Sequence, residues 1–279
     1  MFPGRSPGRS PGRSPTRRAA AVLAPPAAVA AAHIAPAATW LPVVRRRLPR
    51  LAGAGHSGHI ALTFDDGPDP ESTPCFLDAL EEIGVRATFF VLGDGVVRHP
   101  SVVRETVRRG HELAVHGWNH DRPWRPAPAD DVRALLRAVG AIRDLTGRCP
   151  RWYRPPYGIL TSGRWAAART AGLRPVLWTA WGRDWTAGAT PASVRSAVAA
   201  GLRGGGTVLL HDTDRMAAPA CWRAALDALP GIVDGCRAAG LVVGPLAEHG
   251  VPPPRRARAR RCGHDRPQEG DHDEHREEP

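Results

Sequence analysis

The middle of the chain alternates between short apolar runs, which have the composition of buried strands, and longer segments with the period of amphipathic helices. The predicted strands are residues 59–64, 86–93, 111–117, 175–181, 206–212 and 241–246. The predicted helices are residues 72–85, 101–110, 129–147, 164–171 and 192–202, with a pair of helices over 221–240. Ser72 or Thr73 is expected to cap the first helix. Alternation at these spacings predicts an α/β fold with a parallel sheet, and the number of repeats favours a barrel over an open sheet.

Side chains capable of acid–base or metal chemistry follow several of these strands and the segment 151–158. They are Asp65, Asp66, His116, His120, Tyr157, Asp184, His211 and Asp212. In barrels of parallel strands the active site collects at the carboxyl ends of the strands. The pattern therefore predicts one site built from segments that are far apart in the sequence.

Two interpretations fit the adjacent acids Asp65 and Asp66, which end the first predicted strand. Asp-Gly-Pro is ordinary turn chemistry, and the pair would then cap the next helix. Alternatively, a cation beside the two acids offsets their repulsion and keeps both ionised. His116 and His120 are four residues apart and can meet one metal ion together, with one carboxylate as a third ligand and the other free as a base. A site of this kind activates a water molecule and polarises a carbonyl.

Five short segments follow one another along the chain: "TFDDG" (63–67), His-x-x-x-His (116–120), "RPPYG" (154–158), Asp-Trp (184–185) and "LLH" (209–211). Together they resemble the five motifs of the polysaccharide deacetylases, carbohydrate esterase family four. The resemblance runs from about residue 57 to residue 247. It implies a distorted (β/α) barrel of about seven parallel strands. It also implies a hydrolase that removes N-acetyl groups from an amino-sugar glycan, such as a chitin-like oligomer or peptidoglycan.

The resemblance implies a role for each residue that matches a motif. Asp66, His116 and His120 would bind one divalent metal ion, with zinc expected and cobalt or another divalent ion as the alternative. Asp65 would be the general base, and Arg154 would pair with it and hold it ionised.

The remaining matched residues would handle the substrate. The backbone N–H of Tyr157 would help to stabilise the oxyanion, and Leu209 would line the acetyl pocket. His211 would be the general acid that protonates the leaving amine. Trp181 and Trp185, at the two ends of the fourth-motif segment "WGRDW" (181–185), are predicted to shape the substrate groove.

Two positions depart from the family's motifs. Gly117 stands where the second motif usually has Ser or Thr, so a hydrogen bond that supports a metal ligand is missing or replaced. Trp181 stands where the fourth motif usually has an Asp that orients the acidic histidine. Asp184 and Asp212 are the candidates to take over that task, and the alternative for Asp184 is a loop-capping acid.

Other functions remain open on the sequence. The same metal centre would also serve a deacetylase of O-acetylated glycans or a hydrolase of small non-peptide amides, because the motifs describe the centre and not the substrate. A non-catalytic carbohydrate-binding relative is a further alternative. Nucleic-acid binding is not expected, because the formal net charge of +11 comes mainly from the first 56 residues, which hold nine Arg and no acid.

The ends of the chain differ in composition from the middle. Residues 1–56 form a low-complexity Arg/Pro/Ala-rich extension, residues 57–250 the predicted catalytic domain, and residues 251–279 a charged tail expected to be disordered. The uncharged stretch 19–44 has three interpretations, namely a secretory signal, a membrane anchor and a disordered segment. We expect a monomer in the cell envelope or the secreted fraction, with a cytoplasmic location as the alternative.

Overall fold

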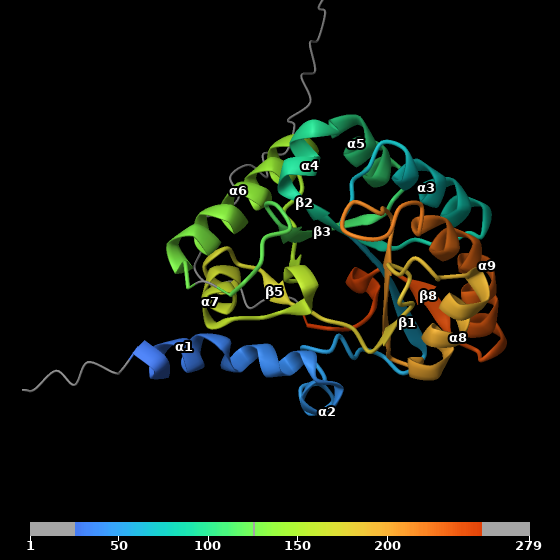
Figure 1. The fold of residues 1–279 in the computed structure, drawn as a ribbon. Helices are drawn as coiled ribbons and strands as arrows, with labels where there is room; N and C mark the ends of the chain where they lie inside the picture. The colour runs from blue at the N-terminus through green and yellow to red at the C-terminus, as the bar shows by residue number, and fades with distance from the viewer. Residues whose placement is uncertain (1–25, 125, 253–279) are drawn as a thin grey trace, which may run out of the picture.

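A computed structural model describes residues 26–124 and 126–252, and its centre is a sheet of parallel strands surrounded by helices (Figure 1). The strands are β1 (His59–Asp65), β2 (Thr88–Leu92), β3 (Glu112–Gly117), β4 (Trp152–Tyr153), β5 (Arg174–Pro175), β6 (Ala180–Trp181), β7 (Thr207–His211) and β8 (Val242–Gly244). The α-helices are α1 (Pro26–Ile34), α2 (Pro42–Arg45), α3 (Ser72–Glu82), α4 (Gly93–Arg98), α5 (Pro100–Arg108), α6 (Pro128–Thr146), α7 (Ser162–Thr170), α8 (Pro191–Gly201) and α9 (Trp222–Ala238). Short 3₁₀ helices are η1 (Ala35–Trp40), η2 (Pro156–Gly158) and η3 (Leu246–Glu248).

Seven strands follow one hydrogen-bonded path in the order β5-β4-β3-β2-β1-β7-β6, and β8 pairs with β1 beside that path. Every strand pair is parallel, so the carboxyl ends of the strands lie at one end of the sheet. The register places Asp65 of β1 between Phe90 of β2 and His211 of β7. The predicted α/β barrel of about seven parallel strands is thereby confirmed, in the form of a half-barrel.

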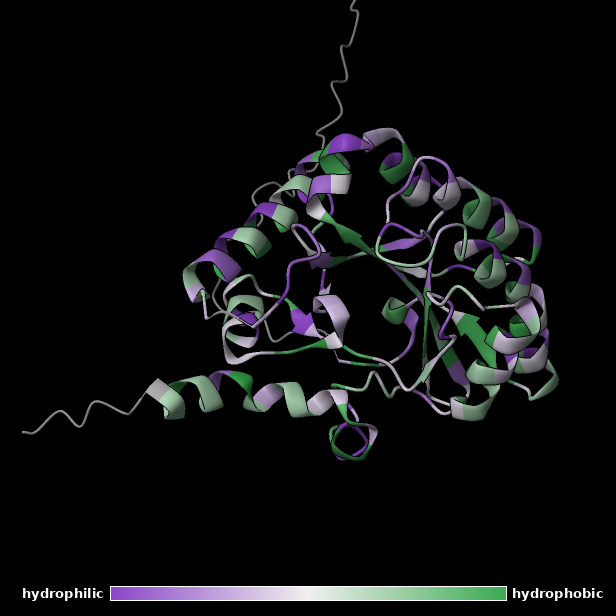
Figure 2. Ribbon diagram, in the orientation of Figure 1, coloured by the Kyte–Doolittle hydropathy of each residue, from purple (hydrophilic) through white to green (hydrophobic). Residues whose placement is uncertain are grey.

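The core lies between the sheet and the helices. All seven residues of β1 are buried, which is why this strand carries an almost continuous apolar run. Phe64 of β1 stacks on Phe89 of β2 and meets the edge of Phe76 of α3, with ring centroids 5.0 and 5.1 Å away. Figure 2 shows β2 and β8 mainly in the green of hydrophobic residues, and hydrophobic and hydrophilic residues alternating along the helices around the sheet.

The predicted strand 175–181 is wrong in its middle. Its two ends form β5 and β6, which lie at opposite ends of the strand path, and the residues between them cross from one to the other. Three backbone groups there bond outside the neighbouring strands, because the carbonyls of Val176 and Leu177 accept from Arg154 and the N–H of Leu177 donates to Leu51.

Two helix predictions also need correction. Residues 222–238 form the single helix α9, with Pro230 inside it, and not a pair of helices. Pro230 is exposed, and Leu229, Ile232 and Val233 are buried around it, so one apolar face continues past the proline. The predicted cap of α3 is wrong as well, because Ser72 is its first residue and the Asp69 carboxylate accepts from the Ser72 N–H at 2.9 Å.

Part of the N-terminal extension is helical and packs on the barrel. Helix α1 contacts α7, and the ring of His33 lies 3.3 Å from the Pro123 carbonyl oxygen. Within the ranges that the structure describes, none of the helices is long and apolar enough to cross a membrane. The repeats between Gly4 and Pro15, the start of the stretch 19–44, and the tail from residue 253 lie outside the described residues. The domain boundaries at 56/57 and 250/251 stay predictions.

Candidate metal and catalytic site

Asp65 ends β1 inside the protein and Asp66 follows it, and each residue keeps only 3% of its surface exposed. Asp66 has a φ of 81°, a conformation that costs a non-glycine residue about 1–3 kcal/mol. Strain of this size persists where the surrounding structure fixes a functional geometry. The turn therefore aims both carboxylates into the end of the sheet, and neither is a simple surface cap.

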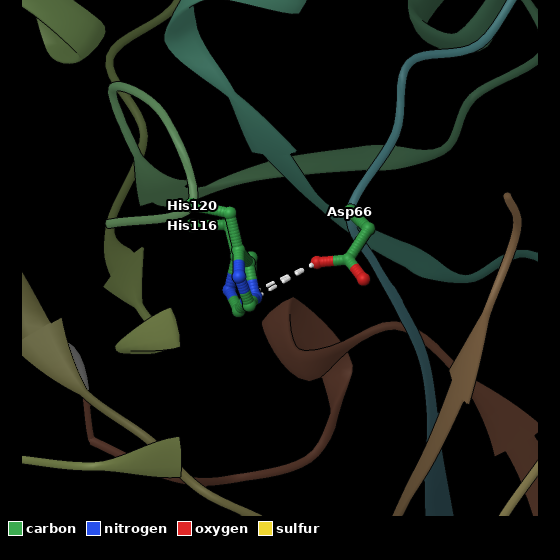
Figure 3. Close-up of side chains that lie close together, drawn as sticks. All are labelled: Asp66, His116 and His120. Atoms are coloured by element: carbon green, nitrogen blue, oxygen red, sulfur yellow. Dashed lines mark ion pairs between the residues drawn. The ribbon is translucent and has the colours of Figure 1, made fainter. Parts of the chain in front are cut away.

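Asp66, His116 and His120 converge on one point (Figure 3). Nε2 of His116 lies 3.1 Å from Oδ1 of Asp66, and Nε2 of His120 lies 3.4 Å from the same oxygen. His116 comes from the end of β3 and His120 from the loop that follows it. One ligand atom from each residue lies within 4.8 Å of the others. The sequence therefore identified three residues that the fold brings together.

These three residues fit a divalent cation. Oδ1 of Asp66 is buried and has no hydrogen-bond partner among the described residues, although two imidazoles face it. Burial alone would raise the pKa of Asp66, but the neighbouring His116 lowers it below its usual range. Burial lowers the pKa of His120 to about 4. An ionised carboxylate and a neutral imidazole are the forms that bind metal, and two His with one Asp suit zinc.

Gly117 has a φ of 122°, a backbone conformation that residues other than glycine rarely adopt. A Ser or Thr at this position would be strained, so the departure from the motif follows from the local backbone. Nδ1 of His116 and Nδ1 of His120 have no hydrogen-bond partner within the described ranges. The supporting hydrogen bond expected at this position is thus not replaced by a described residue.

Arg154 pairs with Asp65 at the same end of the sheet. Its Nη1 donates to Oδ1 of Asp65 at 2.7 Å and to the hydroxyl of Thr63 at 2.9 Å. The guanidinium is fully buried, and its other nitrogens donate to the carbonyls of Val176 and Leu177 at 3.3 and 2.7 Å. A buried arginine with four acceptors is held in one position, and it holds one carboxylate oxygen of Asp65 in place.

Replacement of Arg154 by methionine is expected to lower the free energy of unfolding by about 3–5 kcal/mol, because Asp65 would be left as a buried charge without its partner. Urea denaturation of the chelator-treated protein measures this change. Arg86→Met is the matched control, since Arg86 pairs with Glu248 on the surface, with 56% of its side chain exposed. That variant should lose about 1 kcal/mol or less. Equal losses in the two variants would contradict the assignment.

His211 and Asp184 form a second pair. The Asp184 carboxylate accepts from the backbone N–H of His211 at 2.7 Å, and its other oxygen lies 3.0 Å from Nδ1 of the His211 ring. Burial alone would lower the pKa of His211, but the charge of Asp184 and its hydrogen bond raise it to about 10. Asp184 thus contacts the histidine directly and is more than a loop cap.

Asp212, the other candidate for that task, is hydrogen-bonded to a different residue. Its Oδ2 accepts from the hydroxyl of Thr73 at 2.6 Å, and burial raises its pKa to about 7. The structure therefore brings Asp184 and not Asp212 to the ring of His211.

The remaining predicted residues border the same site. Tyr157 has a φ of 61°, and its ring meets the edge of the His120 ring with centroids 4.3 Å apart. Leu209 is buried in β7, in register with Thr63 and Trp181. Trp185 meets the His211 ring at 5.6 Å, and Trp181 lies 5.0 Å from Trp185.

One aromatic neighbour was missed from the sequence. Trp40, at the end of η1, meets the edge of Trp181 with ring centroids 6.3 Å apart. It belongs to the Ala/Pro-rich extension, outside all five motifs, and no local pattern connects it with the site.

Comparison with known proteins adds independent information. Residues 52–176 match the family model described as polysaccharide deacetylase. A chitooligosaccharide deacetylase of Bradyrhizobium sp. is 41% identical over 170 residues, which cover 61% of this chain and 76% of that protein. The peptidoglycan-N-acetylglucosamine deacetylase PgdA of Listeria monocytogenes is 34% identical over 172 residues, or 62% of this chain. The match spans only 36% of the length of that Listeria enzyme.

A solved structure shares the fold. The crystal structure of the Bc1960 peptidoglycan N-acetylglucosamine deacetylase superposes with a TM-score of 0.66 at 26% identity. The superposition covers 73% of this chain and 94% of that one.

Proposed function

Since this chain belongs to the polysaccharide deacetylase family, we propose that it is a metal-dependent hydrolase that removes N-acetyl groups from an amino-sugar glycan of the chitin or peptidoglycan type. The observation that carries the proposal is the meeting of three groups at one end of the sheet. They are the Asp66–His116–His120 cluster, the Asp65–Arg154 pair and the His211–Asp184 pair. Amide hydrolysis needs an activated water, stabilisation of an oxyanion and protonation of a poor leaving group, and each group suits one need.

Asp65 is the base in this proposal. It lies 3.8 Å from the His116 ring, and Arg154 holds one of its oxygens at 2.7 Å. Arg154 occupies one oxygen of Asp65, so the other oxygen is free to accept a proton from a water that attacks the acetyl carbon. The fixed position of Arg154 also keeps this oxygen aimed at the metal cluster.

Asp66, His116 and His120 would hold one divalent ion, for which zinc is the expected species and cobalt an alternative. When bound, such an ion lowers the pKa of a water molecule and polarises a carbonyl oxygen. The Tyr157 N–H would donate to the developing oxyanion, and Leu209 would pack against the acetyl methyl.

His211 is the acid in this proposal. Asp184 lies 3.0 Å from Nδ1, so Nε2 is the ring nitrogen free to give a proton to the leaving amine. The charge of Asp184 favours the protonated ring, which is the form that an acid needs before the C–N bond breaks.

The relatives also support a location for this activity. Their names specify peptidoglycan and chitooligosaccharides, which are envelope or extracellular glycans. We therefore propose that this chain acts in the envelope or outside the cell.

Treatment of the full-length chain with a chelator is expected to stop acetate release from N-acetylglucosamine oligomers, and added zinc or cobalt should restore it. Acetate is measured by a coupled assay, and bound metal by elemental analysis of the same samples. Undiminished release from protein that holds no metal would contradict the proposed metal dependence. Metal binding without release from any N-acetylated glycan would contradict the proposed substrate.

A further inference from the structure

Three tryptophan rings form a continuous series that leads away from His211. Trp185 lies 5.6 Å from His211, Trp181 lies 5.0 Å from Trp185, and Trp40 lies 6.3 Å from Trp181, all between ring centroids. The first two rings belong to the motif segments. The third comes from η1, which belongs to the N-terminal extension.

Trp40 presents apolar surface to solvent next to this series. It is 44% exposed, whereas Trp181 and Trp185 are partly buried. Its ring stands at 79° to that of Trp181, so the two rings form a corner and do not cover each other. An exposed indole beside a candidate active site offers an aromatic face and a polar N–H to a ligand.

The structure also fastens Trp40 in place. Nη1 of Arg45 donates to the Trp40 carbonyl at 3.1 Å, and the Arg45 guanidinium lies over the Trp178 ring at 4.9 Å. Trp178 in turn stacks on Trp181, with centroids 5.6 Å apart. Arg45 is buried, and none of the ion pairs found within the described ranges includes it. Arg45 therefore links the backbone of Trp40 to the aromatic series. This link holds the Trp40 and Trp181 rings at their angle before any ligand binds.

We propose that Trp40 is a sugar-binding residue that packs against a unit of the glycan remote from the reacting acetyl group. The inference rests on the proposed function and adds a preference for chain length. Each step of the ring series is comparable with the size of one hexose, and the apolar C–H face of a pyranose packs well on an aromatic ring. A short substrate near His211 does not reach Trp40, and a longer oligomer does.

Trp40→Ala is expected to lower kcat/KM for the N-acetylglucosamine hexamer about tenfold, through KM, and to leave the dimer unchanged. The measurement is acetate release from each oligomer by the full-length, metal-loaded chain. Trp40→Phe, which keeps a ring, should recover most of the loss. Leu41→Ala is the matched control, because Leu41 is the next residue and is 48% exposed. It should behave as wild type on both substrates.

The outcomes separate this inference from the proposed function. If wild type and Trp40→Ala show the same ratio of hexamer to dimer activity, Trp40 does not bind the glycan. If wild type releases acetate from neither oligomer, the proposed substrate is wrong, and hexamer binding by equilibrium dialysis then decides about Trp40. A tenfold weaker Kd for Trp40→Ala than for Leu41→Ala would support the binding site, and equal Kd values would overturn it.

Discussion

Replacement of Asp65 by asparagine is expected to reduce kcat for deacetylation by a factor of about 10² to 10⁴, while the chain still binds one divalent ion. Asparagine has the shape of aspartate, and its oxygen can still accept the hydrogen bond that Nη1 of Arg154 donates to Asp65 at 2.7 Å. It cannot take a proton from water. Asp66, His116 and His120 are unchanged in this variant, so metal content by elemental analysis should stay at the wild-type level.

Two further variants make this result specific. His116→Ala removes a ring that lies 3.1 Å from Asp66, so it should lose both the metal and turnover. Asp78→Asn alters an exposed acid that pairs with Arg109 on the surface, and it should keep both. If Asp65→Asn turned over at the wild-type rate, Asp65 would not be the base. If it lost its metal, Asp65 would be a ligand or a support of the ligands.

The alternation of apolar and polar residues was enough to predict the barrel. The strands β1, β2, β3 and β7 are buried over most of their length, so their apolar runs are strong local signals. The prediction failed where backbone bonding is not local. Residues 176–179 are apolar like a strand, but Arg154 bonds the carbonyls of Val176 and Leu177, and Leu51 accepts from the N–H of Leu177.

The candidate site also contains residues that the sequence could predict and a contact that it could not. Asp65, Asp66, His116 and His120 could be found because the carboxyl ends of parallel strands meet at one edge of the sheet. The partner of His211 could not be fixed, because Trp181 occupies the motif position from which an acid was expected. The Asp184 carboxylate contacts both the backbone N–H and the ring of His211. The sequence does not show this contact, which depends on the pairing of β6 with β7.

The contribution of the extension was beyond sequence reasoning for a different reason. Its Ala/Pro-rich composition has no strand or helix period that would assign it to the barrel. Its contacts with the site come from single side chains, Arg45 on Trp178 and Trp40 on Trp181. A domain trimmed at residue 51 would lose both, so experiments on substrate preference require the full chain.

Replacement of His211 by alanine is expected to slow hydrolysis of N-acetylated sugars by a factor of about 10² to 10⁴ and to slow hydrolysis of an aryl acetate less than about tenfold. An amine leaves only when it is protonated, and His211 is the partly exposed group whose pKa Asp184 raises to about 10. A phenolate leaves without a proton, so the ester depends on the rest of the site alone. The two rates are measured on the same metal-loaded protein, which removes differences in metal content from the comparison.

Asp184→Asn tests whether the acid depends on its partner. Without the negative charge 3.0 Å from Nδ1, the pKa of His211 falls, since burial then acts unopposed by Asp184. The ring therefore loses its proton at a lower pH. The alkaline limb of the pH–rate profile for the amide should shift to lower pH, while the profile for the ester should not shift. Equal losses on amide and ester for His211→Ala would mean that this histidine supports the site as a whole and does not donate the proton. An unmoved alkaline limb in Asp184→Asn would separate Asp184 from that proton transfer.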